Sequence, residues 1–298
     1  MRETAAPARS RPEASAILEL LKPITWFAPM WAFGCGVVSS GRPIGENIGA
    51  ILLGLAIAGP LVCATSQAVN DWFDRHVDAI NEPNRPIPSG RMPGRWGLYV
   101  ALIGTALSLA AGWMLGPWGF GATVVALALA WAYSAPPFRL KSDGWIGNTA
   151  VAASYEGLPW FTGAAVMAGT MPEPRILLLA ALYSLGAHGI MTLNDFKSVD
   201  GDTRMGIDSL PVRLGVPLAA RVACAFMAAP QFVAIALLLA WGFPFLAIVL
   251  VLAVGAQLVL MVRLLEAPKA LAPWYNATGT TLYVLGMLVC ALAVARAA

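Results

Sequence analysis

The sequence predicts an all-α integral membrane protein with nine transmembrane helices around a central cavity. Of its 298 residues, 58% are hydrophobic and only 12% are charged, and the mean hydropathy is +0.70. Soluble domains carry about 25% charged residues, so the composition excludes an ordinary soluble fold. Nine apolar runs are each roughly 20 residues long, the length that crosses a bilayer as a helix. The net charge of +3 is small and does not indicate a nucleic-acid partner.

The elements follow one another in a simple order. Residues 1–16 are rich in Ala, Pro and Arg, and we expect them to be a mobile cytoplasmic tail without a signal peptide. Residues 17–298 then form one domain. Its apolar runs lie at 20–39, 47–69, 96–115, 117–134, 148–168, 174–193, 217–240, 243–265 and 274–295. Tight turns are predicted at Gly116-Pro117 and Gly242-Phe243-Pro244, whereas the connections after the second and sixth runs are long and polar.

The basic residues predict the orientation in the membrane. Sixteen of the 19 Arg and Lys residues lie on the side of the N-terminus, and only Arg42, Arg175 and Arg296 lie on the other side. Cytoplasmic loops carry the excess of positive charge. We therefore expect a cytoplasmic N-terminus, an external C-terminus and both polar connections on the cytoplasmic face. The short, partly acidic tail does not resemble an organelle transit peptide, which favours a bacterial inner membrane.

The polar connection after the second run carries three aspartates at helical spacing. If 70–78 is helical, Asp71, Asp74 and Asp78 lie at i, i+3 and i+7 and share one face. Like charges this close repel one another, and burial near lipid increases the cost. A cation should therefore lie among them. Carboxylate oxygens on one face suit Mg²⁺, which fills its shell with water and phosphate oxygens.

A second acidic segment lies 124 residues later. This shift aligns Asn194, Asp195 and Asp202 with the Asn, the first Asp and the last Asp of the first segment. Ser198 replaces the middle aspartate, and Asp200 lies nearby. Each segment alone could be a solvated loop after a membrane helix. Together, at one offset, they predict two pseudo-repeated halves that face each other, each with a metal cluster.

Basic residues in the same connections complete a diphosphate site. Arg85 follows the first acidic segment, Arg139 and Lys141 follow the fourth run, and Lys197 lies within the second segment. Metal ions and basic side chains together neutralise a diphosphate. Loss of diphosphate from an allylic tail yields a carbocation, which an apolar cavity keeps from water.

At this point the sequence resembles a known family, the UbiA-type intramembrane prenyltransferases. The Asn-Asp-x-x-Asp-x-x-x-Asp segment at 70–78, the Asp-rich segment at 194–202 and the nine apolar runs are similar to that family's signature. Within the family, residues 70–90, 154–160 and 194–198 resemble the chlorophyll and bacteriochlorophyll synthases. The resemblance covers the whole chain beyond the N-terminal tail.

The resemblance implies a reaction and a set of site residues. The propionate of a (bacterio)chlorophyllide would be esterified with geranylgeranyl or phytyl diphosphate, with Mg²⁺, in a cytoplasmic or photosynthetic bacterial membrane. It implies that Asp71, Asp74 and Asp78, supported by Asn70, hold one Mg²⁺, that Asp195 and Asp202 hold another with Asp200 as a substitute ligand, and that Arg85, Arg139, Lys141, Lys197 and Asn194 serve the diphosphate. A carboxylate is ionised at neutral pH, so the acceptor needs no strong general base.

Other interpretations stay open at this stage. A quinone- or haem-pathway prenyltransferase would share the fold, a repeat-containing transporter would share the helices, and a structural membrane subunit would need no acidic site. Glu156 in the fifth run would either line the acceptor cavity or pair with a base near the interface. The four cysteines have neither disulfide nor zinc spacing. Most of the 11 tryptophans are expected in interfacial belts or packing.

Overall fold

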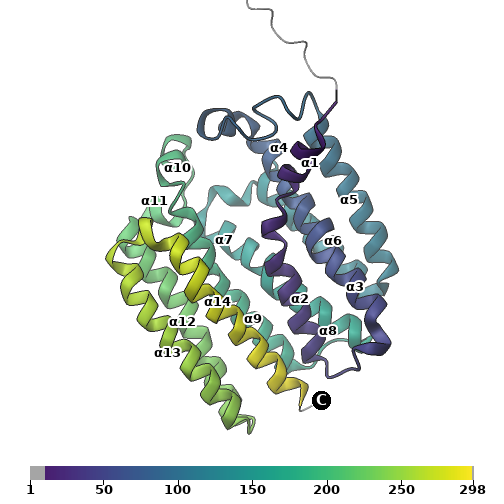
Figure 1. Ribbon diagram of the computed structural model, residues 1–298, viewed down its shortest axis with the longest axis vertical. Helices are drawn as coiled ribbons and strands as arrows, with labels where there is room; N and C mark the ends of the chain where they lie inside the picture. The colour runs from purple at the N-terminus through teal and green to yellow at the C-terminus, as the bar shows by residue number, and fades with distance from the viewer. Residues whose placement is uncertain (1–10, 297–298) are drawn as a thin grey trace, which may run out of the picture.

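The structure, a computed structural model, describes residues 11–296, and these residues are almost entirely helical (Figure 1). The first half contains α1 Ala14–Leu21, η1 Pro23–Thr25, α2 Phe27–Ser39, η2 Gly45–Asn47, α3 Ile48–Ala56, η3 Ile57–Cys63, α4 Ala64–Asn81, α5 Trp96–Met114 and α6 Gly116–Ser134. The second half contains η4 Leu140–Ser142, α7 Gly144–Ala152, η5 Ala153–Gly157, α8 Leu158–Ala168, α9 Pro174–Asp195, α10 Val199–Met205, α11 Leu210–Leu214, α12 Val216–Ala240, α13 Pro244–Glu266 and α14 Pro268–Ala295.

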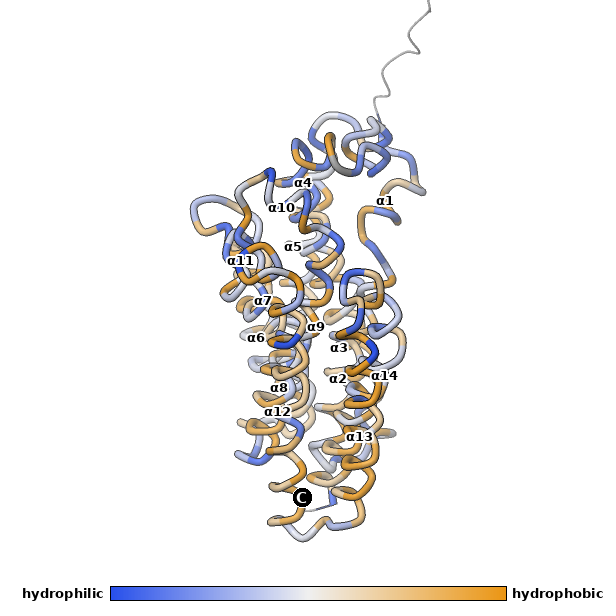
Figure 2. Tube along the Cα trace, turned by 90° about the vertical axis from the view of Figure 1, so that its left-hand side faces the viewer, coloured by the Kyte–Doolittle hydropathy of each residue, from blue (hydrophilic) through white to orange (hydrophobic). Residues whose placement is uncertain are grey.

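The helices form a multi-pass membrane bundle. Six helical segments are long and apolar enough to cross a membrane: Gly45–Ile80, Trp96–Met114, Pro174–Asp195, Val216–Ala240, Pro244–Glu266 and Pro268–Ala295. The shorter helix Phe27–Ser39 is also apolar. Figure 2 shows apolar residues along most of the bundle and hydrophilic ones gathered at the end that carries α1, α4 and α10. The predicted total of nine spans and their orientation stay predictions.

The N-terminal part differs from the expectation. The predicted run 20–39 is not one helix, because the chain breaks at Lys22, whose φ is 45° and ψ is 67°. The following Pro23 disfavours the helical region at Lys22, so α2 begins only at Phe27. The predicted tail is also too long, since α1 begins at Ala14 and buries Ala16 completely. Residues 1–10 lie outside the described part of the chain.

Two of the long helical segments contain a π-helical stretch. In η3, Pro60 has no N–H to donate to the helical hydrogen bonds, and the helix around it has the wider π-helical turn. In η5 the stretch carries Glu156. A hydrogen bond from Cys63 Sγ to the Tyr155 hydroxyl, 3.3 Å long, joins the two π-helical stretches. The second and fifth apolar runs therefore belong to longer segments, Ile48–Asn81 and Gly144–Ala168.

Small residues allow close packing between α2 of the first half and α8 of the second half. A Cβ on Gly36 of α2 would lie 2.0 Å from the Trp160 carbonyl oxygen, and one on Gly163 of α8 would lie 2.2 Å from the Phe33 carbonyl oxygen. Membrane helices use such residues because close backbone approach, and not the hydrophobic effect, holds them together. In the second half, a buried cluster centred on Tyr183 and Tyr283 packs α9 against α14 and α12.

The two tight turns form as predicted. Gly116 joins α5 to α6 with φ of 84°, and Gly242 joins α12 to α13 with φ of 85°. Glycine accepts positive φ without a steric penalty. These turns lie at one end of the bundle (Figure 1), and the acidic segments lie at the opposite, hydrophilic end.

Candidate active site

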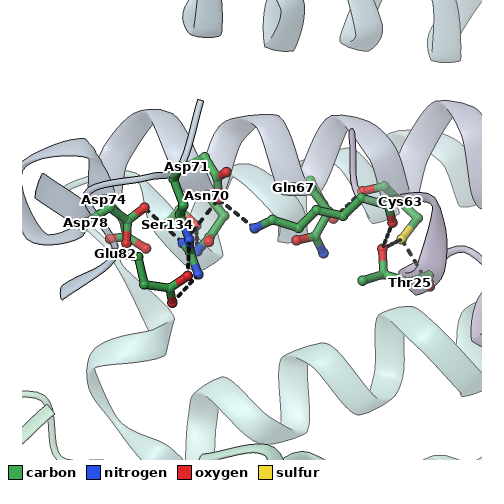
Figure 3. A network of polar contacts seen from close by, with 12 residues as sticks. Thr25, Cys63, Gln67, Asn70, Asp71, Asp74, Asp78, Glu82 and Ser134 are labelled. Carbon is green, nitrogen blue, oxygen red and sulfur yellow. Dashed lines mark hydrogen bonds and ion pairs between the residues drawn. The ribbon is translucent and has the colours of Figure 1, made fainter. Parts of the chain in front are cut away.

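The first acidic segment is helical and places its three aspartates on one face of α4, as predicted (Figure 3). Asp71 is 2% exposed and Asp78 is also buried. Arg85 Nη1 lies 2.9 Å from Asp78 Oδ2 and 3.5 Å from Asp71 Oδ1. One guanidinium thus bridges two buried carboxylates, which would otherwise repel each other.

Lys22 supplies a second cation to this cluster. Its ammonium donates to Asp71 Oδ1 at 2.6 Å from the break between α1 and η1. In the sequence, Lys22 is recognisable only as one of the basic residues of the N-terminal side. Its position directly before Pro23 and the first membrane helix was the signal that could have identified it.

Asp74 faces the connection after α6. It forms an ion pair with Lys141, and Arg139 Nη2 lies 3.8 Å from Asp74 Oδ1. Burial lowers the pKa of the Lys141 ammonium, and the charge of Asp74 opposes that change. Asn70 donates to Ser134 Oγ at 3.3 Å, which fixes the end of α6 to α4. Seven predicted site residues therefore meet at this pole: Asn70, Asp71, Asp74, Asp78, Arg85, Arg139 and Lys141.

Arg85 is held in place by its own turn. It donates to both carboxylate oxygens of Glu82, at 2.7 Å and 2.6 Å. The backbone closes the same turn with a hydrogen bond from Arg85 N to the Glu82 carbonyl oxygen. Such a bidentate pair restricts the guanidinium, so Arg85 reaches the acidic face of α4 in a defined orientation.

The second acidic segment is not one helix. α9 ends at Asp195 and α10 begins at Val199. Asn148 of α7 donates to Asp195 Oδ2 at 2.9 Å. Ser198, at the position where a third carboxylate was missing, donates to Asp202 Oδ2 at 3.1 Å. Burial raises the pKa of the Asp202 carboxyl above its ordinary value.

The two acidic segments face one another. The charges of Asp74 and Lys141 act on Asp202, and the charges of Asp74, Asp195 and Asp202 all act on the Tyr133 hydroxyl at the end of α6. Loop pairing reinforces the contact, because Gly144 N donates to the Asp208 carbonyl oxygen at 2.9 Å. A single pole of the bundle thus holds both clusters.

Three predicted residues do not join this site. The Asp200 side chain is 81% exposed and binds Lys269 Nζ at 3.0 Å. Asn194 Oδ1 accepts from Asn276 on an exposed surface. Lys197 is exposed and acts on Asp195 only through its charge. Asn194 lies on the exposed face of α9, whereas Lys197 and Asp200 follow the end of that helix.

The carboxylates fit a metal ion by chemistry but are paired with bases in this structure. Within residues 11–296, no three acidic, His or Cys side chains are grouped closely enough to hold a metal. Asp71 Oδ2, however, is buried and has no hydrogen-bond partner. Such an oxygen is costly unless a cation or donor satisfies it. Oxygen ligands next to basic side chains suit Mg²⁺ with a phosphate ligand.

A polar stripe continues from the cluster along α4. Gln67, one turn before Asp71, donates to the Tyr155 hydroxyl at 2.9 Å, and Cys63 lies one turn further (Figure 3). Thr25 Oγ1 lies 3.4 Å from Cys63 Sγ. The i, i+4 spacing of Gln67 and Asp71 was visible in the sequence, but the partner Tyr155 was not.

Glu156 does not pair with a base. It is 4% exposed, its Oε2 has no hydrogen-bond partner, and no described Lys or Arg forms an ion pair with it. Of the two alternatives, pairing with a base near the interface is therefore not found among the described residues. The π-helical stretch that carries Glu156 packs against α2, whose Cys35 lines an apolar cavity of about 600 Å³. Trp26, Phe27 and Trp31 contribute aromatic surface to the same cavity.

Comparisons with known proteins agree with this geometry. The family model of the UbiA prenyltransferase family matches residues 26–277. The chain is 59% identical to the bacteriochlorophyll synthase 33 kDa chain of Cereibacter sphaeroides over 286 residues, which cover 96% of this chain and 95% of that one. It is 38% identical to the chloroplastic chlorophyll synthase of Arabidopsis thaliana over 289 residues, covering 93% and 73%.

A solved structure shows the same fold. The UbiA homolog from Archaeoglobus fulgidus bound to GPP and Mg²⁺ superimposes with a TM-score of 0.73 at 19% identity, covering 92% of this chain and 99% of that one. At this identity the likeness concerns the fold.

Proposed function

The chain belongs to the UbiA prenyltransferase family and is a prenyltransferase, and we propose that it esterifies the propionate of a (bacterio)chlorophyllide with geranylgeranyl or phytyl diphosphate. The main support is the convergence of two acidic segments and their basic partners at one pole of an apolar bundle. The relatives named bacteriochlorophyll synthase and chlorophyll synthase favour a tetrapyrrole acceptor over quinone or haem precursors.

We assign Asp71, Asp74 and Asp78 to one Mg²⁺ and Asp195 and Asp202 to a second. Bound Mg²⁺ supplies charge that stabilises the departing diphosphate. The solved UbiA homolog with GPP and Mg²⁺ supports this choice of ion. Asp200 is left out of the ligand set, because its exposed side chain binds Lys269 instead.

Basic residues of the site exchange partners during binding. Arg85 and Lys141 neutralise carboxylates in the structure. When metal ions occupy those carboxylates, both side chains become available to the diphosphate, together with Arg139. Lys197 and Asn194 are left out of this set, because both are exposed and Asn194 is paired with Asn276.

The acceptor needs little activation. Its carboxylate is already ionised at neutral pH and can attack the allylic carbon directly. His188 packs between Trp145 and Phe226, and no described residue forms a His–Asp or Cys–His pair at the acidic pole. The apolar surroundings keep water from the carbocation.

The decisive assay uses purified protein with Mg²⁺, geranylgeranyl or phytyl diphosphate, and chlorophyllide or bacteriochlorophyllide. Ester and free diphosphate should appear in equal amounts. Product formed only with a quinone precursor would reassign the acceptor. A transporter or a structural subunit would leave both substrates unchanged, which would overturn the proposal.

The basic residues also support a location. We place the acidic pole on the cytoplasmic face of a bacterial inner membrane, cytoplasmic or intracytoplasmic. In right-side-out and inverted vesicles, a cysteine introduced at exposed Glu82 should react with an impermeant reagent only in inverted vesicles, and one at exposed Arg42 only in the opposite preparation. The reverse pattern would overturn the orientation.

A further inference from the structure

We infer that Lys22 binds the carboxylate of the acceptor once a metal ion has engaged Asp71. This inference rests on the proposed function, because it names the group that recognises a carboxylate acceptor. The Lys22 ammonium already binds a carboxylate in the structure, at 2.6 Å from Asp71 Oδ1. A metal ion on Asp71, whose Oδ2 has no partner, neutralises this carboxylate and repels the ammonium on Oδ1, so metal binding at Asp71 releases Lys22.

The backbone holds Lys22 in a position that its sequence does not favour. Its φ of 45° is left-handed, a conformation that is unfavourable for a non-glycine residue and that persists only where the surroundings impose it. α1 imposes it here. Ala16 and Leu20 of α1 are fully buried against α4 and α5, and Glu19 pairs with Arg91 at 2.7 Å.

Lys22 stands between the acidic cluster and the apolar cavity. On one side it reaches Asp71, and on the other the next residue, Pro23, lines the cavity of about 600 Å³. That volume lies in the range of small-molecule sites. Trp26 and Phe27 add flat aromatic surface directly after Pro23. A macrocycle against these rings would carry its propionate toward the Lys22 ammonium.

The other bases of the cluster come from elsewhere. Arg85, Arg139 and Lys141 reach the carboxylates from the polar connections after α4 and α6. None of the three lines the cavity. An acceptor carboxylate that leaves water needs a cation near it. Lys22, with its side chain 25% exposed, does not line the cavity itself, but it is the base of this cluster whose chain neighbour, Pro23, does.

The test compares a pigment acid with its methyl ester, without turnover. Chlorophyllide and its propionate methyl ester are titrated into protein loaded with Mg²⁺ and geranylgeranyl thiodiphosphate, an unreactive donor, and binding is read from pigment fluorescence. The wild type should bind the acid about ten- to a hundredfold more tightly, the value of a hydrogen bond to a charged group. Without Mg²⁺, Lys22 stays on Asp71 and this preference should disappear.

Variants separate the roles. Lys22→Met should lose the preference for the acid and keep its affinity for the ester, which also shows that the variant is folded. Lys22→Arg should recover part of the preference. Lys269→Met, which removes one lysine from an exposed pair, should behave as the wild type.

Three outcomes would contradict the inference. Retention of the full preference for the acid by Lys22→Met would contradict it, and so would weakened thiodiphosphate binding alone, which would assign Lys22 to the donor. If the wild type binds neither pigment form, the proposed function itself fails, and the inference fails with it.

Discussion

Asn148 donates a hydrogen bond of 2.9 Å to Asp195 Oδ2 and thereby connects α7 to the last residue of α9. Asn148 is buried and also donates to Thr192 Oγ1 at 3.3 Å. The amide therefore orients the first carboxylate of the second acidic segment. Residues that orient metal ligands matter for metal affinity almost as much as the ligands themselves.

Replacing Asn148 with Ala should raise the Mg²⁺ concentration that activity requires. Loss of the donor leaves Asp195 free to rotate, so we expect the Mg²⁺ concentration for half-maximal rate to rise about ten- to a hundredfold. Asn47→Ala, a change at a half-buried position in η2 at the opposite pole, serves as the control. Equal Mg²⁺ curves for both variants would refute this role.

Asp71→Asn and Asp200→Asn form a matched pair. Both remove one aspartate charge from an acidic segment, but Asp71 is buried in the cluster and Asp200 is exposed. We expect Asp71→Asn to lower the rate of ester formation by about 10²-fold or more, whereas Asp200→Asn keeps a rate near that of the wild type. EDTA should abolish the activity of both variants. Diluting the EDTA without adding Mg²⁺ should not restore that activity. A large loss in Asp200→Asn would return this residue to the ligand set.

Asp143 should make stability depend on pH. It caps α7 by accepting from Ile146 N and Trp145 N at 3.0 and 2.9 Å, and these backbone hydrogen bonds, that of Ile146 first, lower the pKa of its carboxyl. A carboxyl whose pKa is lower in the folded state stabilises the fold at pH values above its unfolded-state pKa. This stabilisation is lost as the pH falls through the folded-state pKa.

Asp143→Asn keeps the cap but loses the charge, so its melting temperature should approach that of the wild type as the pH falls from about 5 to about 3. Asp143→Ala should cost about 1 kcal/mol at pH 7, the usual value of a helix cap. Thermal unfolding in one detergent across this pH range checks both. A constant difference between wild type and Asp143→Asn at every pH would contradict the linkage.

Gly163 and Gly255 provide a packing test. A Cβ on Gly163 would meet the backbone of α2 at 2.2 Å, whereas a Cβ on Gly255 would meet nothing within 4 Å. Gly163→Ala should therefore lower the melting temperature, because a backbone neighbour cannot move aside as a side chain does. Gly255→Ala should be neutral or raise it, since Ala favours helix by about 1 kcal/mol. Equal effects would show that α2 and α8 are not closely packed.

The sequence by itself determined the features that depend on local spacing and composition. The apolar runs, the shared face of Asp71, Asp74 and Asp78, and the turns at Gly116 and Gly242 follow from helical period, hydropathy and backbone preference. The acidic and basic segments also sufficed for the resemblance to the UbiA family, because their motifs are contiguous in the chain.

Only the tertiary structure decided which groups meet across the bundle. Lys22 reaches Asp71 over 49 positions and Asn148 reaches Asp195 over 47, and no local pattern encodes such pairs. Asp200 satisfied the sequence pattern and still points outward, because the chain breaks between α9 and α10. Side-chain direction after a helix end depends on packing between distant segments, and for that reason the pattern could propose ligands but could not select among them.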